Sequence, residues 1–237
     1  MKIACWSGPR NISTALMRSW SSRDDTFVSD EPFYAHYLKV TGLNHPMKEE
    51  IINNYPTNRD DIIQVLTSNI PNKKEIWYQK HMAQHLLDIN DLSWIKNFKN
   101  CILIRHPKFV INSYIKKNTL KNVSDLGYPQ QLSIIEFLKK ENIEFYIIET
   151  DNFLENPPKQ LSDWCNFLEI DFHEKMLSWP RGPHKNDGIW EKHWYNNINN
   201  SQNFSKKIGD SSNNYKKYKS IYNDAIYIYK KIYNMKF

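Results

Sequence analysis

Short apolar runs alternate with amphipathic stretches along the first part of the chain. Five of these runs are almost continuously apolar and rich in β-branched or aromatic residues, which is typical of strands buried on both faces of a sheet. They read KIACW at 2–6, TFVSDE at 26–31, EIWYQK at 75–80, CILIRH at 101–106 and FYIIET at 145–150. The pattern therefore predicts five buried strands.

The stretches between these runs carry apolar residues at the spacing of a helix that packs on one face. The predicted helices cover 13–22, 59–70, 81–89, 107–117 and 128–142. Strands that alternate with helices are joined by crossover connections, which produce a parallel sheet with helices on both faces. The pattern thus predicts an α/β fold.

The pattern changes after Thr150. Residues 157–170 predict a helix that begins with two prolines, and residues 178–198 have the mixed Pro, Gly, Trp and basic composition of a loop. Tyr and Ile at helical spacing predict a closing amphipathic helix over about 213–237. Because the chain shows no linker and no internal repeat, we expect residues 1–237 to form a single domain.

Composition narrows the class of protein. The apolar fraction of 40% belongs to a folded chain and excludes a disordered one. The formal charge of +6 favours anionic partners such as nucleotides, sulfated or phosphorylated groups, or nucleic acid. Cys5, Cys101 and Cys165 are widely spaced, which indicates reduced core thiols. No apolar run is long enough for a signal peptide or a membrane span, so we expect a soluble, cytoplasmic protein.

Charged and polar residues follow four of the predicted strands. In a parallel sheet the ligand binds at the carboxyl ends of the strands, so these residues are the candidates for a site. They are Ser7-Gly8-Pro9-Arg10, Asp30-Glu31-Pro32, Lys80-His81 and Arg105-His106-Pro107.

The first of these segments, WSGPRNIST, has the layout of a phosphate-binding loop between a strand and a helix, although it lacks a Gly-Lys-Ser or Gly-Lys-Thr sequence. The backbone N–H groups at the helix start, the Arg10 guanidinium and the hydroxyls of Ser13 and Thr14 would suit a bound oxyanion. The same residues also fit an ordinary turn in which Ser13 or Thr14 caps the helix. Taken alone, the loop leaves both interpretations open.

Arg105 and Ser113 form a second candidate pair. If a helix begins at Pro107, the Ser113 hydroxyl lies nearly two turns into it and could share a phosphate with the arginine at the strand end. A serine inside a helix commonly faces water or bonds to a backbone carbonyl instead, so this pairing is a weak signal by itself.

The two motifs together resemble those of the sulfotransferases. Residues 9–14, Pro-Arg-Asn-Ile-Ser-Thr, resemble the 5′-phosphosulfate loop of that family, and Arg105-His106-Pro107 followed by Ser113 resembles its 3′-phosphate motif. The segment GPHKNDGIWEKHW at 182–194 is similar to a late basic loop that folds over the cofactor. The resemblance spans residues 2 to about 204, and over this range the chain is similar to bacterial sulfotransferase-like P-loop proteins. It implies a P-loop NTPase-like three-layer fold with a central parallel sheet flanked by helices.

The resemblance also implies a co-substrate, 3′-phosphoadenosine 5′-phosphosulfate, and no metal. Arg10 would replace the loop lysine of the family, Ser13 and Thr14 would hold the 5′-phosphate, and Arg105 and Ser113 the 3′-phosphate. Either Arg181 or Lys185 would add a contact to the 3′-phosphate, with Gly188 and Trp190 nearby. The cofactor-binding residues implied are Gly8, Pro9, Arg10, Asn11, Ile12, Ser13, Thr14, Arg105, Ser113, Arg181, Lys185, Gly188 and Trp190.

Two residues compete for the role of catalytic base. His81 has a near-neutral ordinary pKa and resembles the catalytic histidine of the family in position, whereas Glu31 resembles the carboxylate base of some members. The residues leave this choice open, and both also fit structural roles. Arg10 is the third candidate catalytic residue. Because it replaces lysine, and Ile12 replaces glycine, the loop departs from the family at two positions, which leaves room for weak catalysis.

The acceptor is not determined by the sequence beyond a hydroxyl or amine of a small molecule or carbohydrate. Residues 33–55 and 118–128 are expected to shape its pocket. No nucleic acid and no membrane is expected as a partner, and the oligomeric state stays open. Two other functions remain possible at this point: a small-molecule P-loop kinase that uses ATP and Mg²⁺, and a non-catalytic nucleotide- or RNA-binding protein.

Overall fold

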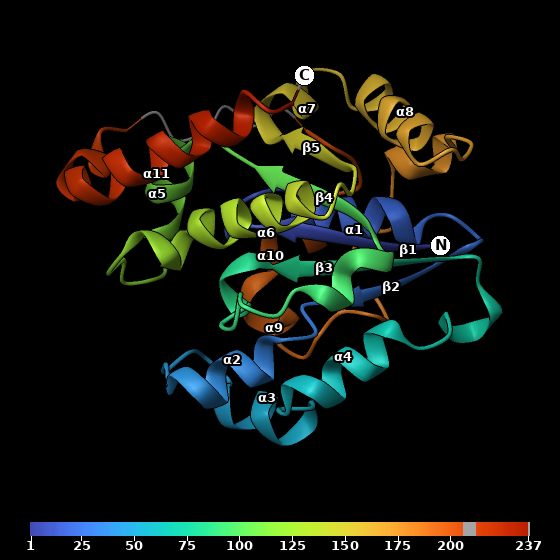
Figure 1. The fold of residues 1–237 in the computed structure, drawn as a ribbon, viewed down its shortest axis with the longest axis horizontal. Helices are drawn as coiled ribbons and strands as arrows, with labels where there is room; N and C mark the ends of the chain where they lie inside the picture. The colour runs from blue at the N-terminus through green and yellow to red at the C-terminus, as the bar shows by residue number, and fades with distance from the viewer. Residues whose placement is uncertain (206–211, 237) are drawn as a thin grey trace.

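The computed structural model describes residues 1–205 and 212–236, and it is built around one parallel sheet. The strand order is β2-β3-β1-β4-β5 (Figure 1). The strands are β1 Lys2–Ser7, β2 Thr26–Asp30, β3 Ile76–Met82, β4 Lys99–Ile104 and β5 Phe145–Glu149. This arrangement confirms the predicted α/β fold with a central parallel sheet, and each of the five predicted runs forms a strand.

The pairing register brings the carboxyl ends of the strands together at one edge. Ser7, the last residue of β1, pairs with Met82 of β3 and with Leu103 of β4. Asp30, the last residue of β2, pairs with Lys80. Side chains that follow each strand therefore lie side by side, although they are far apart in the sequence.

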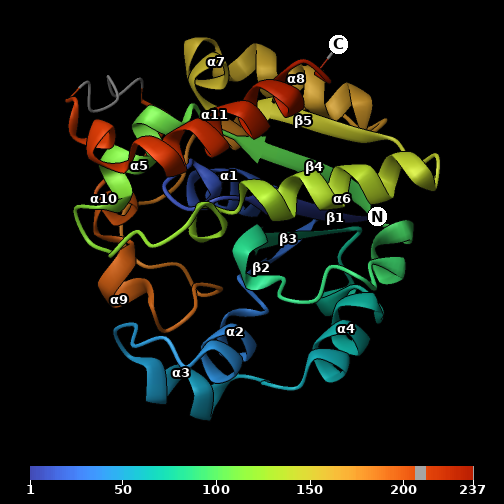
Figure 2. The same ribbon diagram turned by 60° about the vertical axis from the view of Figure 1, so that its left-hand side comes forward.

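Helices cover both faces of the sheet (Figures 1 and 2). On one face, α1 (Ser13–Ser21) packs with α8 (Pro157–Phe167), and the rings of Trp20 and Trp164 meet edge to face at 5.1 Å. The other face is covered by helices whose residues Ile62, Ile134 and Ile232 are buried in the hydrophobic core on that side of the sheet. These helices are α4 (Arg59–Thr67), α6 (Tyr128–Lys140) and α11 (Lys219–Tyr233).

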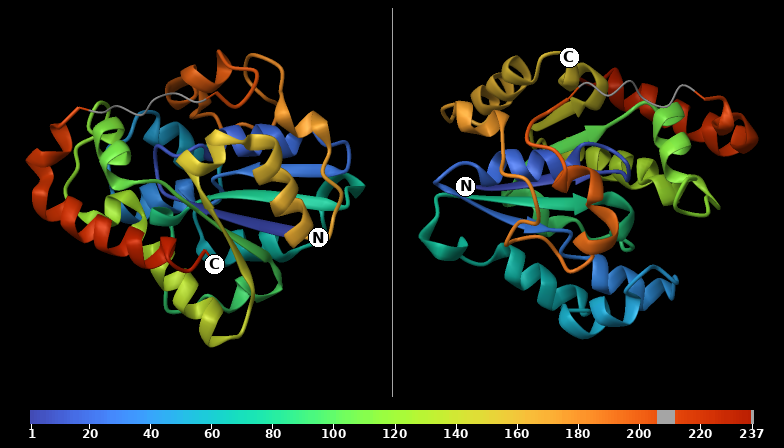
Figure 3. Two further views of the ribbon diagram at one scale, coloured as in Figure 1. Left: turned by 90° about the horizontal axis from the view of Figure 1, so that it is seen from above. Right: turned by 180° about the vertical axis from the view of Figure 1, so that it is seen from behind.

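A third group of helices lies beyond the carboxyl edge; in Figure 2 two of them lie below the sheet and two at its left. It consists of α2 (Tyr34–Thr41), α3 (Lys48–Asn54), α9 (Glu191–Trp194) and α10 (Asn196–Asn199). Tyr34, Ile51, Trp190 and Tyr195 form its buried core. Residues 178–205, called the late segment below, cross the rear of the sheet near α1 before they reach this group (Figure 3, right).

The remaining elements connect these layers. They are α5 (Pro107–Tyr114), α7 (Thr150–Glu155) and the 3₁₀ turns Pro71–Lys73, Ala83–His85, Ser93–Asn97, Val123–Leu126, Glu174–Leu177 and Asn214–Tyr218. Among the described residues, no helix is both long and apolar enough to cross a bilayer.

Two of the predicted helices differ from the structure. The helix predicted over 81–89 is wrong, because His81 and Met82 continue β3 and only Ala83–His85 forms a single 3₁₀ turn. Backbone pairing of His81 with Trp6 outweighs the local helical pattern there. The closing helix begins at Lys219 and not near 213, and Phe237, its predicted end, lies outside the described residues.

Candidate active site

The loop between β1 and α1 is held in an unusual backbone conformation. Arg10 has a φ of 61°, in the left-handed region that non-glycine residues rarely adopt. Gly8 packs so tightly that a Cβ placed on it would lie 2.4 Å from the carbonyl oxygen of Leu126. The loop therefore needs glycine at this position, because the turn before Gly127 presses against it.

The start of α1 is open to a ligand. Its N-cap residue is Ile12, and no side chain accepts a hydrogen bond from the first N–H groups. The alternative in which Ser13 or Thr14 caps the helix is thus not formed. Both residues line a cavity of about 550 Å³ instead. Uncapped N–H groups and the helix dipole favour an anion in that cavity.

The two predicted phosphate motifs meet in this cavity. Arg10 Nε donates a hydrogen bond of 2.8 Å to Ser113 Oγ, and Arg105 Nη1 donates one of 3.3 Å to the carbonyl oxygen of Arg10. Burial and the positive charge of Arg105 together lower the pKa of Arg10. Arg105 also contacts Asp151 Oδ1 at 3.3 Å. Two guanidinium groups held side by side, with one carboxylate on the outer arginine, form a site that an anion would stabilise.

The predicted cofactor residues of the loop fall into two groups, those that line the cavity and one that supports the loop. Pro9, Arg10, Asn11 and Ile12 line the cavity together with Ser13 and Thr14, whereas Gly8 supports the loop from behind. The Asn11 amide donates a hydrogen bond to the carbonyl oxygen of Leu103 at 3.1 Å. The loop is thereby tied to the end of β4, next to Arg105.

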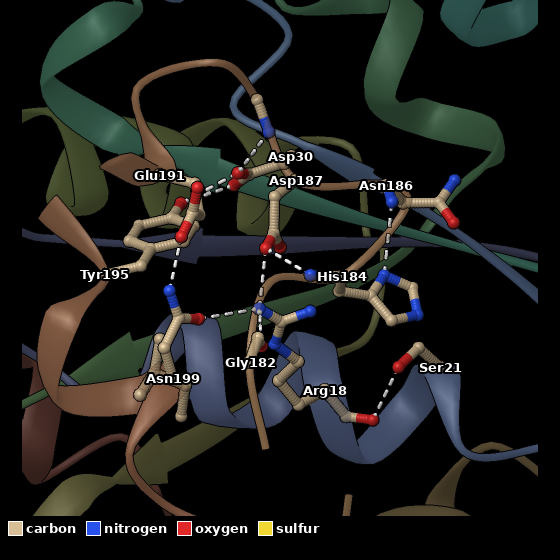
Figure 4. Close-up of polar contacts among 12 residues, drawn as sticks. Arg18, Ser21, Asp30, Gly182, His184, Asn186, Asp187, Glu191, Tyr195 and Asn199 are labelled. Atoms are coloured by element: carbon tan, nitrogen blue, oxygen red, sulfur yellow. Dashed lines mark hydrogen bonds and ion pairs between the residues drawn. The ribbon is translucent and has the colours of Figure 1, made fainter. Parts of the chain in front are cut away.

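A buried ion network stands at the floor of the cavity. Lys80 Nζ donates hydrogen bonds to Asp30 Oδ1 at 2.8 Å and to Glu31 Oε1 at 2.7 Å, and it also contacts the Tyr195 hydroxyl. Tyr195 donates to the Asp30 carboxylate at 2.8 Å (Figure 4). Burial lowers the pKa of Lys80, but the two carboxylates outweigh it and raise the pKa overall. Lys80 is thus held as a cation that fixes Glu31 at the cavity wall.

The sequence analysis named Asp30 among the strand-end candidates without giving it a role, and it missed Tyr195. Asp30 stands directly before Glu31 at the end of β2, so its strand-end position was a usable signal. Tyr195 follows β3 by more than a hundred residues and lies in a segment with no strand pattern. Its contact with Lys80 depends on how the late segment packs, which the local sequence does not reveal.

The first half of the late segment is fastened to α1, whereas later residues of the segment, such as Trp194 and Phe204, line the cavity. Arg18 Nη2 and Asp187 Oδ2 form a buried ion pair of 2.6 Å, and Arg18 also contacts Asn199 Oδ1 at 3.3 Å (Figure 4). Burial raises the pKa of Asp187 to about 6 although the Arg18 charge opposes the shift. The Gly188 N–H donates to Asp30 Oδ2 at 3.1 Å, and this bond ties the segment to the floor network.

This packing places four of the expected cofactor residues outside the cavity. Arg181 and Lys185 are exposed and do not line the cavity, and neither do Gly188 and Trp190. Trp190 is buried against Tyr34, with ring centroids 5.1 Å apart. The Arg18–Asp187 pair holds residues 182–190 against the back of the sheet, which turns the two basic side chains toward solvent.

The side chain of His81, a candidate base, does not line the cavity. Its side chain is 1% exposed and stacks on Trp6 at 4.3 Å, on the opposite face of β3 from Lys80. Burial, followed by the influence of His85, lowers the pKa of His81 to about 3. Successive residues of a strand point to opposite faces, so only one of Lys80 and His81 can face the cavity. Glu31 and Lys80 line it, and so does His85, which the sequence analysis did not select.

Comparison with known proteins identifies the family of the chain. A family model described as a sulfotransferase domain matches residues 1–233. The chain belongs to this sulfotransferase family. The match confirms the resemblance to the sulfotransferases.

Two Arabidopsis thaliana proteins are similar to this sulfotransferase-family chain. They are named branched-chain-amino-acid aminotransferase-like protein 2 and protein 1, and they are 34% and 33% identical to it over 203 residues. The aligned region covers 86% of this chain but only 36% of each relative. The chain therefore spans about a third of the length of the curated relatives it matches.

Solved structures of sulfotransferase domains share the fold. The domain from the curacin biosynthetic pathway has a TM-score of 0.52 at 19% identity and covers 79% of this chain and 80% of its own. The domain from the Synechococcus PCC 7002 olefin synthase has a TM-score of 0.52 at 17% identity, with 75% and 76% covered. At these identities the likeness shows that the architecture of the sheet and its helices is shared.

Proposed function

We propose that the chain transfers a sulfuryl group from 3′-phosphoadenosine 5′-phosphosulfate to a hydroxyl or amine of a small molecule. The observation that carries the proposal is the meeting of Arg10, Arg105 and Ser113 at the open start of α1, in one cavity with Glu31. Family membership supports the same reaction class.

The donor is placed by its two anionic groups. The 5′-phosphosulfate takes the uncapped N–H groups of α1 with the hydroxyls of Ser13 and Thr14, and the 3′-phosphate takes Arg105 and Ser113. Arg10 lies between the two phosphate positions, because it belongs to the loop after β1 and contacts Ser113. Two groups of anion-binding residues that line one cavity suit a nucleotide with phosphates on both sides of its ribose.

The chemical step needs a base and charge stabilisation. Glu31 removes the proton from the acceptor, the acceptor oxygen or nitrogen forms a bond to sulfur, and the bond between sulfur and the bridging oxygen breaks. The products are the sulfated acceptor and 3′-phosphoadenosine 5′-phosphate, with the proton on Glu31. Arg10 stabilises the negative charge that develops on the departing phosphate oxygen.

The proposal has three further parts. The acceptor is a small molecule or carbohydrate, the protein is cytoplasmic, and residues 1–237 form a single domain. Among the described residues, no group of three or more His, Cys, Asp and Glu side chains is arranged to hold a metal ion. The donor chemistry proposed here needs none, because its charge is met by the two arginines and the helix start.

Calorimetry separates this function from a kinase. The protein is titrated with 3′-phosphoadenosine 5′-phosphate and, separately, with ATP plus Mg²⁺. We expect tight binding of the bisphosphate and weak binding of ATP, and a preference for ATP would overturn the proposal. Arg105→Ala should weaken bisphosphate binding at least about tenfold because a charged contact is lost. Arg181→Ala is the matched control, since this arginine is exposed and lies outside the cavity.

A further inference from the structure

The cavity has a second end whose chemistry is opposite to that of the arginine end. Four aromatic residues line it: Tyr34 and Tyr37 from α2, Tyr114 from the end of α5, and Trp194 from α9. We call these four residues the aromatic chamber. Such a wall of rings presents negatively polarised faces to whatever occupies the space between them.

Two carboxylates accompany the aromatic chamber in the cavity lining, Glu31 and Asp125. Asp125 Oδ2 accepts backbone hydrogen bonds from Lys121 at 2.7 Å and Asn122 at 3.1 Å. In the part of the chain that the structure describes, Oδ1 of Asp125 accepts no hydrogen bond. Burial and the Asp125 charge together raise the pKa of Tyr37 to about 12. The negative charge of Asp125 therefore reaches into the chamber.

His85 supplies an unsatisfied polar atom beside Glu31. The ring is 4% exposed and lies between Tyr34 and Tyr37, with centroids at 4.8 and 4.6 Å. Its Nδ1 has no hydrogen-bond partner among the described residues and lies 4.0 Å from Glu31 Oε2. Burial holds the pKa of His85 well below its usual range, so the ring is neutral. One hydroxyl can bond to both atoms, because two hydrogen bonds of about 2.8 Å span a gap of 4.0 Å at a bent angle.

The charge balance at this end favours a cation. Lys80 is shared between Asp30 and Glu31, so these three groups keep one formal negative charge. Asp125 adds another, and the neutral His85 does not offset it. Lys116 also lines the cavity but is exposed to solvent, where water screens its charge. Lys117 Nζ lies 5.8 Å from the centroid of the Trp194 ring but is likewise exposed. Once an anionic donor occupies the arginines, Lys80 is the buried cation left among the described residues that line this end, and its charge is already shared between Asp30 and Glu31.

We propose that the acceptor is a small alcohol or phenol that also carries an ammonium group. Its hydroxyl lies between Glu31 Oε2 and His85 Nδ1, and its ammonium group lies against the rings of the aromatic chamber and Asp125. Cation–π attraction and the free Asp125 oxygen hold the charge, while Glu31 receives the hydroxyl proton. This inference rests on the proposed function, because it assigns the acceptor class of the same reaction.

The test compares three phenols of similar size on protein saturated with 3′-phosphoadenosine 5′-phosphate. Tyramine carries an ammonium group, para-ethylphenol is neutral, and para-hydroxyphenylpropionate is an anion. By calorimetry we expect tyramine to bind at least about tenfold more tightly than para-ethylphenol, and the anion to bind most weakly. Equal binding of all three, tighter binding of the neutral or anionic phenol, or no binding of tyramine overturns the inference.

Variants locate the preference in the chamber. Asp125→Asn keeps an oxygen for the backbone bonds but removes the charge, and should reduce the tyramine preference several-fold. Tyr114→Leu should do the same, whereas Tyr114→Phe retains the ring and the preference. An unchanged preference in both Asp125→Asn and Tyr114→Leu contradicts the assignment. Bisphosphate affinity, measured first, distinguishes the two failures: its absence refutes the proposed function, and its presence without a tyramine preference refutes only this inference.

Discussion

Arg10 Nε donates a hydrogen bond of 2.8 Å to Ser113 Oγ, across more than a hundred residues of sequence. This single contact joins the loop after β1 to the helix after β4, so the two candidate phosphate motifs meet in one cavity. The backbone of Arg10 has a positive φ of 61°, a conformation that costs free energy in a residue other than glycine.

The first prediction concerns the coupling of these two residues. Arg10→Ala and Ser113→Ala should each weaken binding of 3′-phosphoadenosine 5′-phosphate about tenfold or more, because each removes a polar contact to a phosphate. The double variant should lose less than the sum of the two free energies, since Ser113 orients Arg10. Calorimetry on all four proteins measures this, with Ser162→Ala on α8 as the control. Strict additivity would show that the serine does not orient the arginine.

The second prediction concerns Glu31 as the base. Glu31→Gln preserves the shape and an oxygen for Lys80 but cannot accept a proton. We expect kcat to fall by about 10²–10⁴-fold, the usual contribution of a general base, with bisphosphate affinity unchanged. Steady-state assays of sulfate transfer and calorimetry provide the two readouts. Near-normal turnover would remove Glu31 from the mechanism, and Glu49→Gln on exposed α3 is the matched control.

The third prediction separates His81 from His85. His81→Leu should leave turnover within a few-fold of the unaltered enzyme, because the ring packs on Trp6 and is uncharged. His85→Leu should lower turnover at least about tenfold, since Nδ1 faces Glu31 across the space assigned to the acceptor. Both are assayed well below their melting temperatures. A folded His81→Leu protein without activity would restore His81 as the candidate base.

The fourth prediction is a pH dependence of stability at Asp187. The folded pKa of about 6 lies above the unfolded value of 3.8, so the native state binds an extra proton between about pH 4 and pH 6. This group's contribution therefore makes the unfolding free energy fall as the pH rises through that window, and it is constant above it. Asp187→Asn removes the dependence, because the amide does not ionise.

Thermal melts of both proteins at pH values below and above this window provide the measurement. The variant should gain stability relative to the unaltered protein at the higher pH. A variant that loses stability there would mean that the Arg18 ion pair outweighs the burial of the carboxylate. Asp163→Asn is the control, because Asp163 pairs with Lys159 at the surface.

Much of the donor half of the site was predictable from the sequence. Glu31 and Arg105 directly follow strands that the apolar runs reveal, Arg10 lies in the loop after β1, and Lys80 lies near the end of β3. Parallel strands bring such positions to one edge. The fold followed from the same runs, since alternation with helices leaves few topologies. Local pattern and position along a strand were enough for these residues.

The acceptor half was not predictable in the same way. Residues of both expected segments, 33–55 and 118–128, do reach the cavity, but the aromatic chamber also takes Trp194 from the late segment. That segment is placed by the Arg18–Asp187 pair and the bond from Gly188 to Asp30, contacts that join residues more than 150 positions apart. The sequence analysis read the same residues as part of the phosphate site.

The sequence by itself determined the parallel sheet, the edge where the candidate site lies and the positions of the two candidate phosphate motifs, because each depends on periodicity or on short spacing. Only the tertiary structure decided which of Lys80 and His81 faces the cavity. A strand buried on both faces lacks an alternating pattern, so the direction of each side chain depends on pairing with β1 and β2. The same holds for the late segment, whose position depends on contacts between residues far apart in the sequence, such as Arg18 with Asp187 and Asp30 with Gly188, and not on any local pattern.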